Sequence, residues 1–182
     1  MQAVQAAARS AAQARQTSTT APVSVPNGLA TGGLDPNLAA GWTGANAPTQ
    51  TASDGQTTVG IQQTAAQAIL NWTTFNIGAQ TTLSFNQQGN ASWVALNRVV
   101  GSTAPSQILG NINADGQVYV INQNGIIFGG NSQINVGSLI ASSAGITDQQ
   151  FLTNGIYSTQ TGNTYNPSFT GAGARSSSSR AR

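Results

Sequence analysis

The apolar residues of this 182-residue chain recur in short runs from Thr57 onward. The first run alternates Val59 and Ile61 with polar neighbours, which is the period of a half-buried β-strand. Later runs follow at spacings of about eight to ten residues, separated by Asn-Gly, Asp-Gly and Gly-Gly pairs that favour tight turns. The pattern predicts about eight strands of roughly four to seven residues. These strands are expected in the runs TTVGIQQT, AILNWTTFNIG, TTLSFNQ, WVALNRVV, SQILGNI, QVYVI, GIIFG and QINVGSLI.

The large side chains of these runs are the expected core of the fold. We expect stacking inside the fold for Trp72, Phe75, Phe85, Trp93 and Phe128. Residues 26–56 precede the runs and are punctuated by Pro and Gly, so they are interpreted as loop. Trp42 lies in this stretch and is expected to cover an edge of the core.

The polar residues decide between the possible β architectures. Strands of this length suit a sandwich, a barrel or a solenoid. Asn recurs near Gly at the ends of the runs, at Asn111, Asn113, Asn122, Asn124, Asn131 and Asn135. Inward-turned Asn side chains can bond the backbone of the next coil of a solenoid, and Gly permits sharp corners. The pattern therefore favours a parallel β-solenoid, with a β-sandwich as the alternative.

Composition divides the chain into three zones. Residues 1–26 form an Ala/Gln-rich leader that is expected to be flexible, because an isolated helix of this length is marginal in water. Residues 27–169 are expected to fold as one domain, and residues 170–182 form a Ser/Arg-rich tail that is expected to be disordered. The start of the chain lacks the apolar segment of a signal peptide. We therefore expect that a signal was removed or that the start is not that of the native precursor. Because the Ser/Arg-rich tail cannot continue a folded repeat well, we also expect a fragment, a truncated gene product or a recombinant piece.

The charged residues exclude most chemistry. The sequence contains no His, Cys, Lys or Glu, so sites of the Ser-His-Asp, Cys-His and zinc types cannot form. Between residues 16 and 174 there are four dispersed Asp residues and one Arg, Arg98, which gives no basic stripe for a nucleic acid. We predict that the chain is not an enzyme and has no cofactor, metal, small-molecule substrate or nucleic-acid partner.

Four blocks carry a resemblance to a known family. They are NWTTFNIG at 71–78, WVALNRVVG at 93–101, SQILGNINADGQVYVINQNGIIFG at 106–129 and INVGSLIAS at 134–142. In this order they resemble the two-partner secretion (TPS) domain of filamentous-haemagglutinin-type exoproteins, or haemagglutination activity domain, over residues 27–151. One difference is visible: the family usually has Asn-Pro-Asn-Gly-Ile where this chain has Asn122-Gln123-Asn124-Gly125-Ile126. Without Pro the turn loses one φ restraint, but Asn-Gly still favours it.

The resemblance implies an all-β fold, a right-handed parallel β-helix (β-solenoid) with an amino-terminal cap and short extra-helical strands. It implies the amino-terminal secretion domain of a large bacterial adhesin or exoprotein, secreted or held at the cell surface. The implied partner is an outer-membrane transporter, whose POTRA domains recognise the domain in the periplasm, and the domain then nucleates β-helix folding. Host cells are expected to be contacted only through the passenger.

Two alternatives to an export role remain open. One is an adhesin module that itself binds host glycans or proteins. The other is a β-helix enzyme acting on polysaccharide, which requires the four Asp residues to converge in space.

Five residues are the candidates for transporter recognition or turn formation: Asn97, Arg98, Asn122, Asn124 and Gly125. Arg98 is the single cation of the central region, so a contact role is plausible on charge grounds. The alternative is that Arg98 bonds backbone carbonyls or pairs with an aspartate such as Asp115. For the Asn-Gly turn, turn formation alone is a sufficient explanation.

Overall fold

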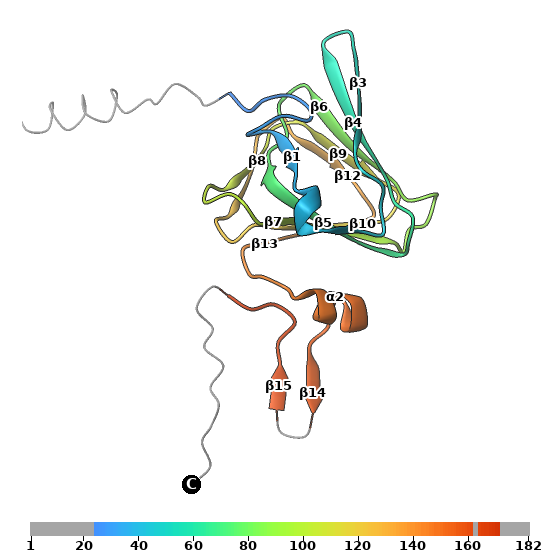
Figure 1. Ribbon diagram of the computed structural model, residues 1–182, viewed down its shortest axis with the longest axis vertical. Coiled ribbons are helices and arrows are strands. Elements are labelled where there is room, and N and C mark those ends of the chain that lie inside the picture. Colours follow the sequence, from blue (N-terminus) through green and yellow to red (C-terminus); the bar gives the residue numbers. More distant parts are fainter. Residues whose placement is uncertain (1–23, 162–163, 172–182) are drawn as a thin grey trace, which may run out of the picture.

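The computed structural model describes residues 24–161 and 164–171 (Figure 1). Its body is a β-solenoid of about four turns, built mostly from parallel strands. The predicted parallel β-helix is thus confirmed. The predicted flexible leader at 1–26 and disordered tail at 170–182 lie, apart from their innermost residues, outside the described residues.

The solenoid has three faces, and each complete coil contributes one strand to each face in turn. The first face contains β4 (Gln56–Gln62), β6 (Thr81–Asn86), β9 (Asn111–Ala114) and β12 (Gln133–Asn135). The second face contains β5 (Gln67–Phe75), β7 (Val94–Val99), β10 (Gln117–Ile121) and β13 (Ser138–Ser142). The third and shortest face contains β8 (Ser106–Ile108) and β11 (Ile126–Phe128), with Ile77 bridged to Ile108. The chain runs from first to second to third face and then begins the next coil.

Parallel register stacks like side chains in ladders along the inside of the solenoid. On the second face one inward ladder contains Ala68, Ala95, Val118 and Leu139. On the first face the matching ladder contains Val59, Leu83, Ile112 and Ile134. Because side chains alternate across a strand, one residue in two faces this core, which is the period visible in the sequence.

Glycines separate the strands at tight corners. The predicted runs SQILGNI and QINVGSLI each form two strands rather than one, since the chain turns at Gly110 and at Gly137. A Cβ on Gly110 would collide with the carbonyl oxygens of Gly78 and Thr81 in the preceding coil. This corner therefore accepts only glycine. Because each of the two runs is divided at a glycine, the number of strands predicted from the sequence was too low.

Residues 34–53, which the sequence analysis interpreted as loop, contain three strands. β1 (Leu34–Pro36) and β2 (Trp42–Thr43) pair antiparallel with β5 and, with the 3₁₀ helix η1 (Leu38–Ala40), cap the amino-terminal end of the second face. β3 (Thr49–Ser53) pairs antiparallel with β4, and Figure 1 shows this hairpin projecting from the body. The loop interpretation was wrong because all five β3 residues are exposed, so no alternation of apolar residues marks the strand.

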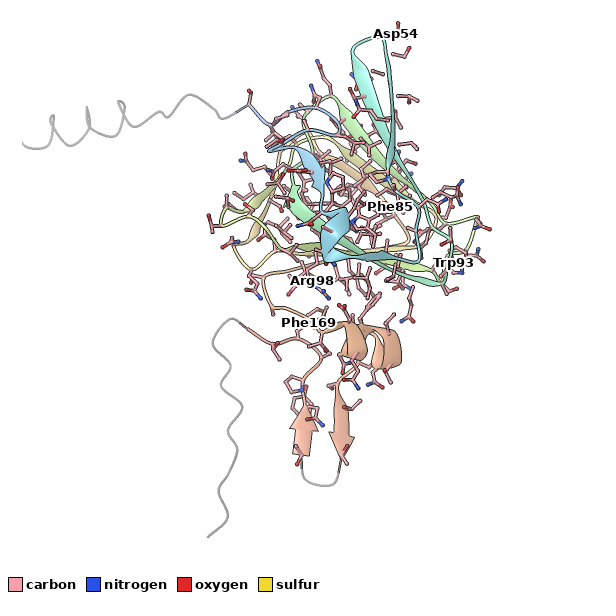
Figure 2. The ribbon with its side chains drawn as sticks, in the orientation of Figure 1. Asp54, Phe85, Trp93, Arg98 and Phe169 are labelled. Carbon is pink, nitrogen blue, oxygen red and sulfur yellow. The ribbon has the colours of Figure 1, made fainter. Side chains whose placement is uncertain are left out.

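Trp42 covers an edge of the core, as predicted. Its half-buried ring packs edge-to-face on Trp72 at a centroid distance of 5.0 Å, and its Nε1 donates a hydrogen bond to the carbonyl of Asn71 at 2.8 Å. Trp72, Phe75 and Phe85 are buried, as predicted. The placement of Phe85 inside the coils is visible in Figure 2.

Two predicted core aromatics lie elsewhere. Phe128 is 40% exposed, because β11 is the last third-face strand of the described chain and no described strand pairs with its outer edge. Trp93 is half-buried at the corner that precedes β7, and Figure 2 shows it at the margin of the body. The prediction that both stack inside the core was therefore wrong.

After β13 the chain leaves the coils and covers the outside of the second face. This outer segment, residues 146–161 and 164–169, contains α2 (Asp148–Asn154), β14 (Thr159–Thr161) and β15 (Thr164–Asn166). The resemblance implied short extra-helical strands, but the helix and the positions of these strands were not predicted. Both ends of the outer segment meet at the Gly145–Thr170 bridge, where each N–H donates to the other carbonyl at 2.8 Å. Within the described ranges no helix is long and apolar enough to cross a membrane.

The outer segment creates a second apolar core. Its buried residues are Ile69, Leu96, Tyr119, Ile121, Ile146 and Phe151. Phe151 packs edge-to-face on Tyr119 at a centroid distance of 6.2 Å. Burial raises the pKa of the Tyr119 hydroxyl, and the neighbouring Tyr157 raises it further. The second face is thus covered on both sides, one side by the coil interior and the other by the outer segment.

Candidate functional site

The Asn-Gly turn after β10 is built by its own side chains. Asn122 is 1% exposed and its Nδ2 donates to the Ala104 carbonyl and to Ser106 Oγ, at 3.1 and 3.0 Å. Its Oδ1 accepts from the backbone N–H of Asn124 at 2.9 Å, and the Gly125 N–H donates to its carbonyl, also at 2.9 Å. Gly125 has a φ of 101°, which favours glycine. The turn therefore forms without the family's proline.

Arg98 joins the coils to the outer segment. It is on the outward side of β7, in register with Asn71 and Ile121. Its Nη1 lies 2.7 Å from Asp148 Oδ1, and its Nη2 donates to the Ile146 carbonyl at 2.9 Å. Figure 2 shows Arg98 between the solenoid and the segment that ends near Phe169. The guanidinium thus bonds both a carbonyl and an aspartate, as the alternative reading expected.

Asp115, the aspartate suggested as a partner for Arg98, is not that partner. Its Oδ2 accepts from the backbone N–H groups of Gln87 and Gly89, at 3.2 and 3.1 Å. Asp115 therefore stabilises a corner loop on the opposite end of the second-face strands. The sequence could not show that Asp148 and not Asp115 pairs with Arg98. This pairing depends on how the outer segment folds back onto the second face.

Removal of the Arg98–Asp148 pair is expected to loosen the outer segment modestly. In a double-mutant cycle with Arg98→Leu and Asp148→Asn, we expect a coupling free energy of about 0.5–1 kcal/mol. The two side chains are 20% and 57% exposed, so solvent screens the pair. Arg98→Leu should cost more than Asp148→Asn, because it also removes the bond to the Ile146 carbonyl. Urea unfolding measures these free energies.

Two outcomes of this cycle would contradict the assigned role of Arg98. One is a coupling free energy of zero at low salt. The other is equal destabilisation by the two single variants, which would mean that the Ile146 bond contributes nothing. Asn135→Ala, on the exposed side of β12, is the control and should leave stability unchanged.

Asn97 is inside the solenoid and not at its surface. It is fully buried in the inward ladder between Leu70 and Val120. Its Oδ1 accepts from Trp72 Nε1 at 3.0 Å, and its Nδ2 donates to the carbonyls of Ala95 and Tyr119, both at 3.2 Å. The bond to Tyr119 joins β7 to the following coil, as expected for an inward Asn ladder.

A groove lies where three successive coils leave the second face. Its volume is about 430 Å³. It is lined by Arg98, Val99, Val100, Ser102, Ile121, Gln123, Asn124, Gly145 and Ile146. The groove thus brings together two predicted site residues, Arg98 and Asn124, with Asn122 and Gly125 in the adjoining turn and Asn97 apart in the core. Sequence reasoning missed Val100, Gln123 and Ile146, which become neighbours only through coil register.

The aspartates of the described part of the chain lie apart. This part of the chain holds no cluster of three or more His, Cys, Asp or Glu side chains that could bind a metal ion. Asp54 is at the tip of the β3–β4 hairpin in Figure 2, whereas Asp115 and Asp148 have the separate partners described above. The convergence of aspartates that a polysaccharide-active enzyme requires does not occur among these residues.

Comparison with known proteins identifies the fold. The family model described as the TPS secretion domain matches residues 38–180. The chain belongs to the TPS secretion domain family. The crystal structure of the HMW1 secretion domain from Haemophilus influenzae is similar to this TPS domain, with a TM-score of 0.50 and 30% identity. That likeness covers 62% of this chain and 30% of the HMW1 chain.

Two curated relatives also match part of this TPS domain. The heme/hemopexin-binding protein of Haemophilus influenzae is 42% identical over 81 residues, which cover 44% of this chain and 8% of the relative. The corresponding protein of the Rd strain is 41% identical over 81 residues, 44% of this chain and 9% of the relative. Each match therefore covers under a tenth of the length of the relative.

The family has direct consequences for the class of protein. A TPS domain is a secretion module of exoproteins such as HMW1, not a member of a catalytic family. It implies a cognate outer-membrane transporter as partner.

Proposed function

We propose that this TPS domain is recognised in the periplasm by the POTRA domains of its cognate outer-membrane transporter and then nucleates β-helix folding of a large surface exoprotein. The observation that carries the proposal is the family match across residues 38–180, on a solenoid whose groove gathers Arg98 and Asn124. We assign residues 27–169 to the secretion domain, which the return of the chain at the Gly145–Thr170 bridge supports.

The chemistry of the groove suits a neutral peptide segment. Val100 is 46% exposed and Gln123 is exposed, so an apolar group and a carboxamide are both accessible. The charge of Arg98 is already paired with Asp148, which leaves no net charge to select an ionic ligand. Main-chain amides and apolar side chains of a partner segment could bond Gln123 and Asn124 and pack on Val100.

The last coil supports the folding part of the proposal. No described strand pairs with the outer edges of β11, β12 and β13. Ile134 and Leu139, the last members of the inward ladders, are only partly buried, and Phe128 on β11 is 40% exposed. A further coil would satisfy the free backbone groups and cover these side chains, so each coil is a template for the next.

The composition of the chain supports passage in an unfolded state. The sequence has no Cys that could form a disulfide before export and only 5% charged residues. Contact with host cells is assigned to the passenger and not to this domain. We expect the exoprotein itself to be secreted or held at the bacterial cell surface.

Changes in the groove are expected to block export without unfolding the domain. The double variant Val100→Asp and Gln123→Ala should lower secretion through the cognate transporter about tenfold or more, because a desolvated carboxylate and a lost hydrogen bond weaken the contact. The same variant should bind a purified POTRA fragment at least about tenfold more weakly in a titration. Immunoblots of culture medium and cell fractions measure secretion.

The control separates recognition from folding. Asn135→Ala lies on the first face, away from the groove, and should be secreted normally. The groove variant should keep the wild-type melting temperature, since both side chains face solvent. Normal secretion of the groove variant would show that the groove is not the contact surface. If the purified cognate POTRA fragment did not bind the wild-type domain, the proposed recognition itself would be wrong.

A further inference from the structure

The outer segment leaves the coils and returns to them at one point. This point is the Gly145–Thr170 bridge, which we call the neck. Figure 1 shows α2 and the β14–β15 hairpin together below the coils. Because both ends of the outer segment meet at the neck, the segment can turn away from the second face without changing the path of the coils.

The outer segment contacts three successive coils across the second face. Gln67 of β5 donates from Nε2 to the Phe151 carbonyl at 2.8 Å. Arg98 of β7 makes the ion pair and the carbonyl bond described above. Tyr119 of β10 packs against the ring of Phe151. The outer segment in its closed position therefore ties the three coils together from outside.

These contacts are weaker than the packing inside the coils. Of the described residues of the outer segment, Ile146 and Phe151 are buried, and Ile156 and Phe169 are partly buried. Solvent screens the ion pair, and α2 has seven residues, too few for a helix that is stable away from a packing surface. The coils instead hold continuous ladders of fully buried apolar side chains. Opening of the outer segment therefore costs less free energy than unfolding of the coils.

The outer segment also supplies one wall of the groove. Ile146, its first residue, lines the groove and belongs to the second core, and Ile121 of β10 is shared in the same way. Arg98 lines the groove as well, and its guanidinium is held by Asp148 of the outer segment. Opening takes Ile146 out of the groove and leaves Arg98 without its carboxylate. Both the shape and the charge of the groove thus depend on the outer segment.

We propose that the outer segment opens as a unit on the neck while the coils stay folded, and that the groove is complete only when the segment is closed. A partner that binds the complete groove then favours the closed state, and closure favours the partner to the same extent. This control of recognition rests on the function proposed above, whereas the opening itself does not.

Thiol labelling of the purified domain tests the opening, because the chain has no cysteine of its own. Ala95 and Leu96 are neighbours on β7 and both are 0% exposed, but Ala95 belongs to the coil interior and Leu96 to the second core. A maleimide reaches the thiol of Leu96→Cys once the outer segment opens, and that of Ala95→Cys only once the coils unfold. We expect native Leu96→Cys to react about a hundredfold faster or more, and both variants to react equally in urea. Equal rates in the native domain would overturn the proposal.

Two neighbouring residues of α2 test which contacts hold the segment closed. In the Leu96→Cys background, Phe151→Ala should raise the labelling rate about tenfold or more, because Phe151 is buried against the second face. Leu152 is 49% exposed, so Leu152→Ala is the matched control and should leave the rate unchanged. Equal effects of the two substitutions would contradict the docking of α2 through Phe151.

Hydrogen exchange tests the opening without any substitution. The Phe151 and Gly155 amides are bonded within α2, to the carbonyls of Thr147 and Phe151. We expect both amides to exchange with one common free energy of opening, and clearly faster than the Val118 amide of β10. Exchange of the α2 amides as slow as that of Val118 would mean that the outer segment opens only when the coils unfold.

The purified cognate POTRA fragment tests the link to the groove. At saturation it should slow the labelling of Leu96→Cys about tenfold or more, because it binds the closed state. Unchanged or faster labelling in the complex would overturn the link. A fragment that does not bind the wild-type domain would contradict the proposed function instead, while the contrast between Leu96→Cys and Ala95→Cys would still decide the opening.

Discussion

Trp72→Ala is expected to lower the free energy of unfolding by about 3–5 kcal/mol, the range typical of a large aromatic removed from a core. Trp72 is completely buried and packs edge-to-face on Trp42 and Phe75, at centroid distances of 5.0 and 5.3 Å. Its removal opens a cavity below the amino-terminal cap. It also leaves the buried Oδ1 of Asn97 without its donor. Urea unfolding followed by far-ultraviolet circular dichroism measures the loss.

Two further variants separate the packing of Trp72 from its hydrogen bond. Trp72→Phe keeps much of the ring but leaves Asn97 Oδ1 unpaired, so it should cost about 1–3 kcal/mol. Trp93→Ala removes a half-buried tryptophan at a corner and should cost clearly less than Trp72→Ala. Equal losses at Trp72 and Trp93 would contradict the placement of Trp72 at the centre of the core.

The strands of the coils could be predicted because they leave a local signal. Alternating residues such as Val59 and Ile61 face the interior, and glycines such as Gly110 mark the corners where only a hydrogen fits. The run at Ala68–Leu70 is apolar without alternation, and all three of its side chains are buried. Such a run indicates a strand covered on both sides. That signal of a second core is present in the sequence, although no prediction above rests on it.

The cover itself could not be predicted from the residues. α2 has one buried apolar side chain, Phe151, which is too weak a periodic signal to identify a helix of seven residues. The β3 strand is exposed on both sides and carries no apolar pattern. Both elements are determined by tertiary contacts, with the second face and with β4.

The candidate site was predictable in part for the same reason. Asn124 and Gly125 belong to a local turn, whose chemistry is legible in sequence. The approach of Arg98 to Asn124 depends on parallel register between β7 and β10, which places residues of successive coils side by side. Asn97 lies next to Arg98 in sequence, yet strand alternation turns it into the core. Adjacent residues of one motif thus have opposite surroundings.

Gln87→Leu is expected to destabilise the domain by about 3 kcal/mol or more, because it leaves several buried polar groups unpaired. Gln87 is fully buried at the corner between the first and second faces, and links three coils. Its Nε2 donates to Gln63 Oε1 at 3.0 Å and to the Trp93 and Gln117 carbonyls at 3.2 and 3.4 Å. Its Oε1 accepts from the Gly116 N–H at 2.6 Å. Urea unfolding measures the loss of stability.

A second measurement tests the mechanism of that loss. Leucine cannot accept the Gly116 N–H, so hydrogen exchange at this amide should accelerate in Gln87→Leu beyond the change at the Val118 amide inside β10. Gln63 is the partner of Gln87, so Gln63→Leu and Gln87→Leu should be non-additive, with the double variant losing less than the sum of the two single losses. Gln133→Leu changes an exposed glutamine of β12 and should cost almost nothing. Strict additivity at positions 63 and 87, or equal losses at 87 and 133, would contradict a buried glutamine link between coils. The expected pattern instead makes each coil complete the hydrogen bonds of the coil before it, so that register errors between coils are costly.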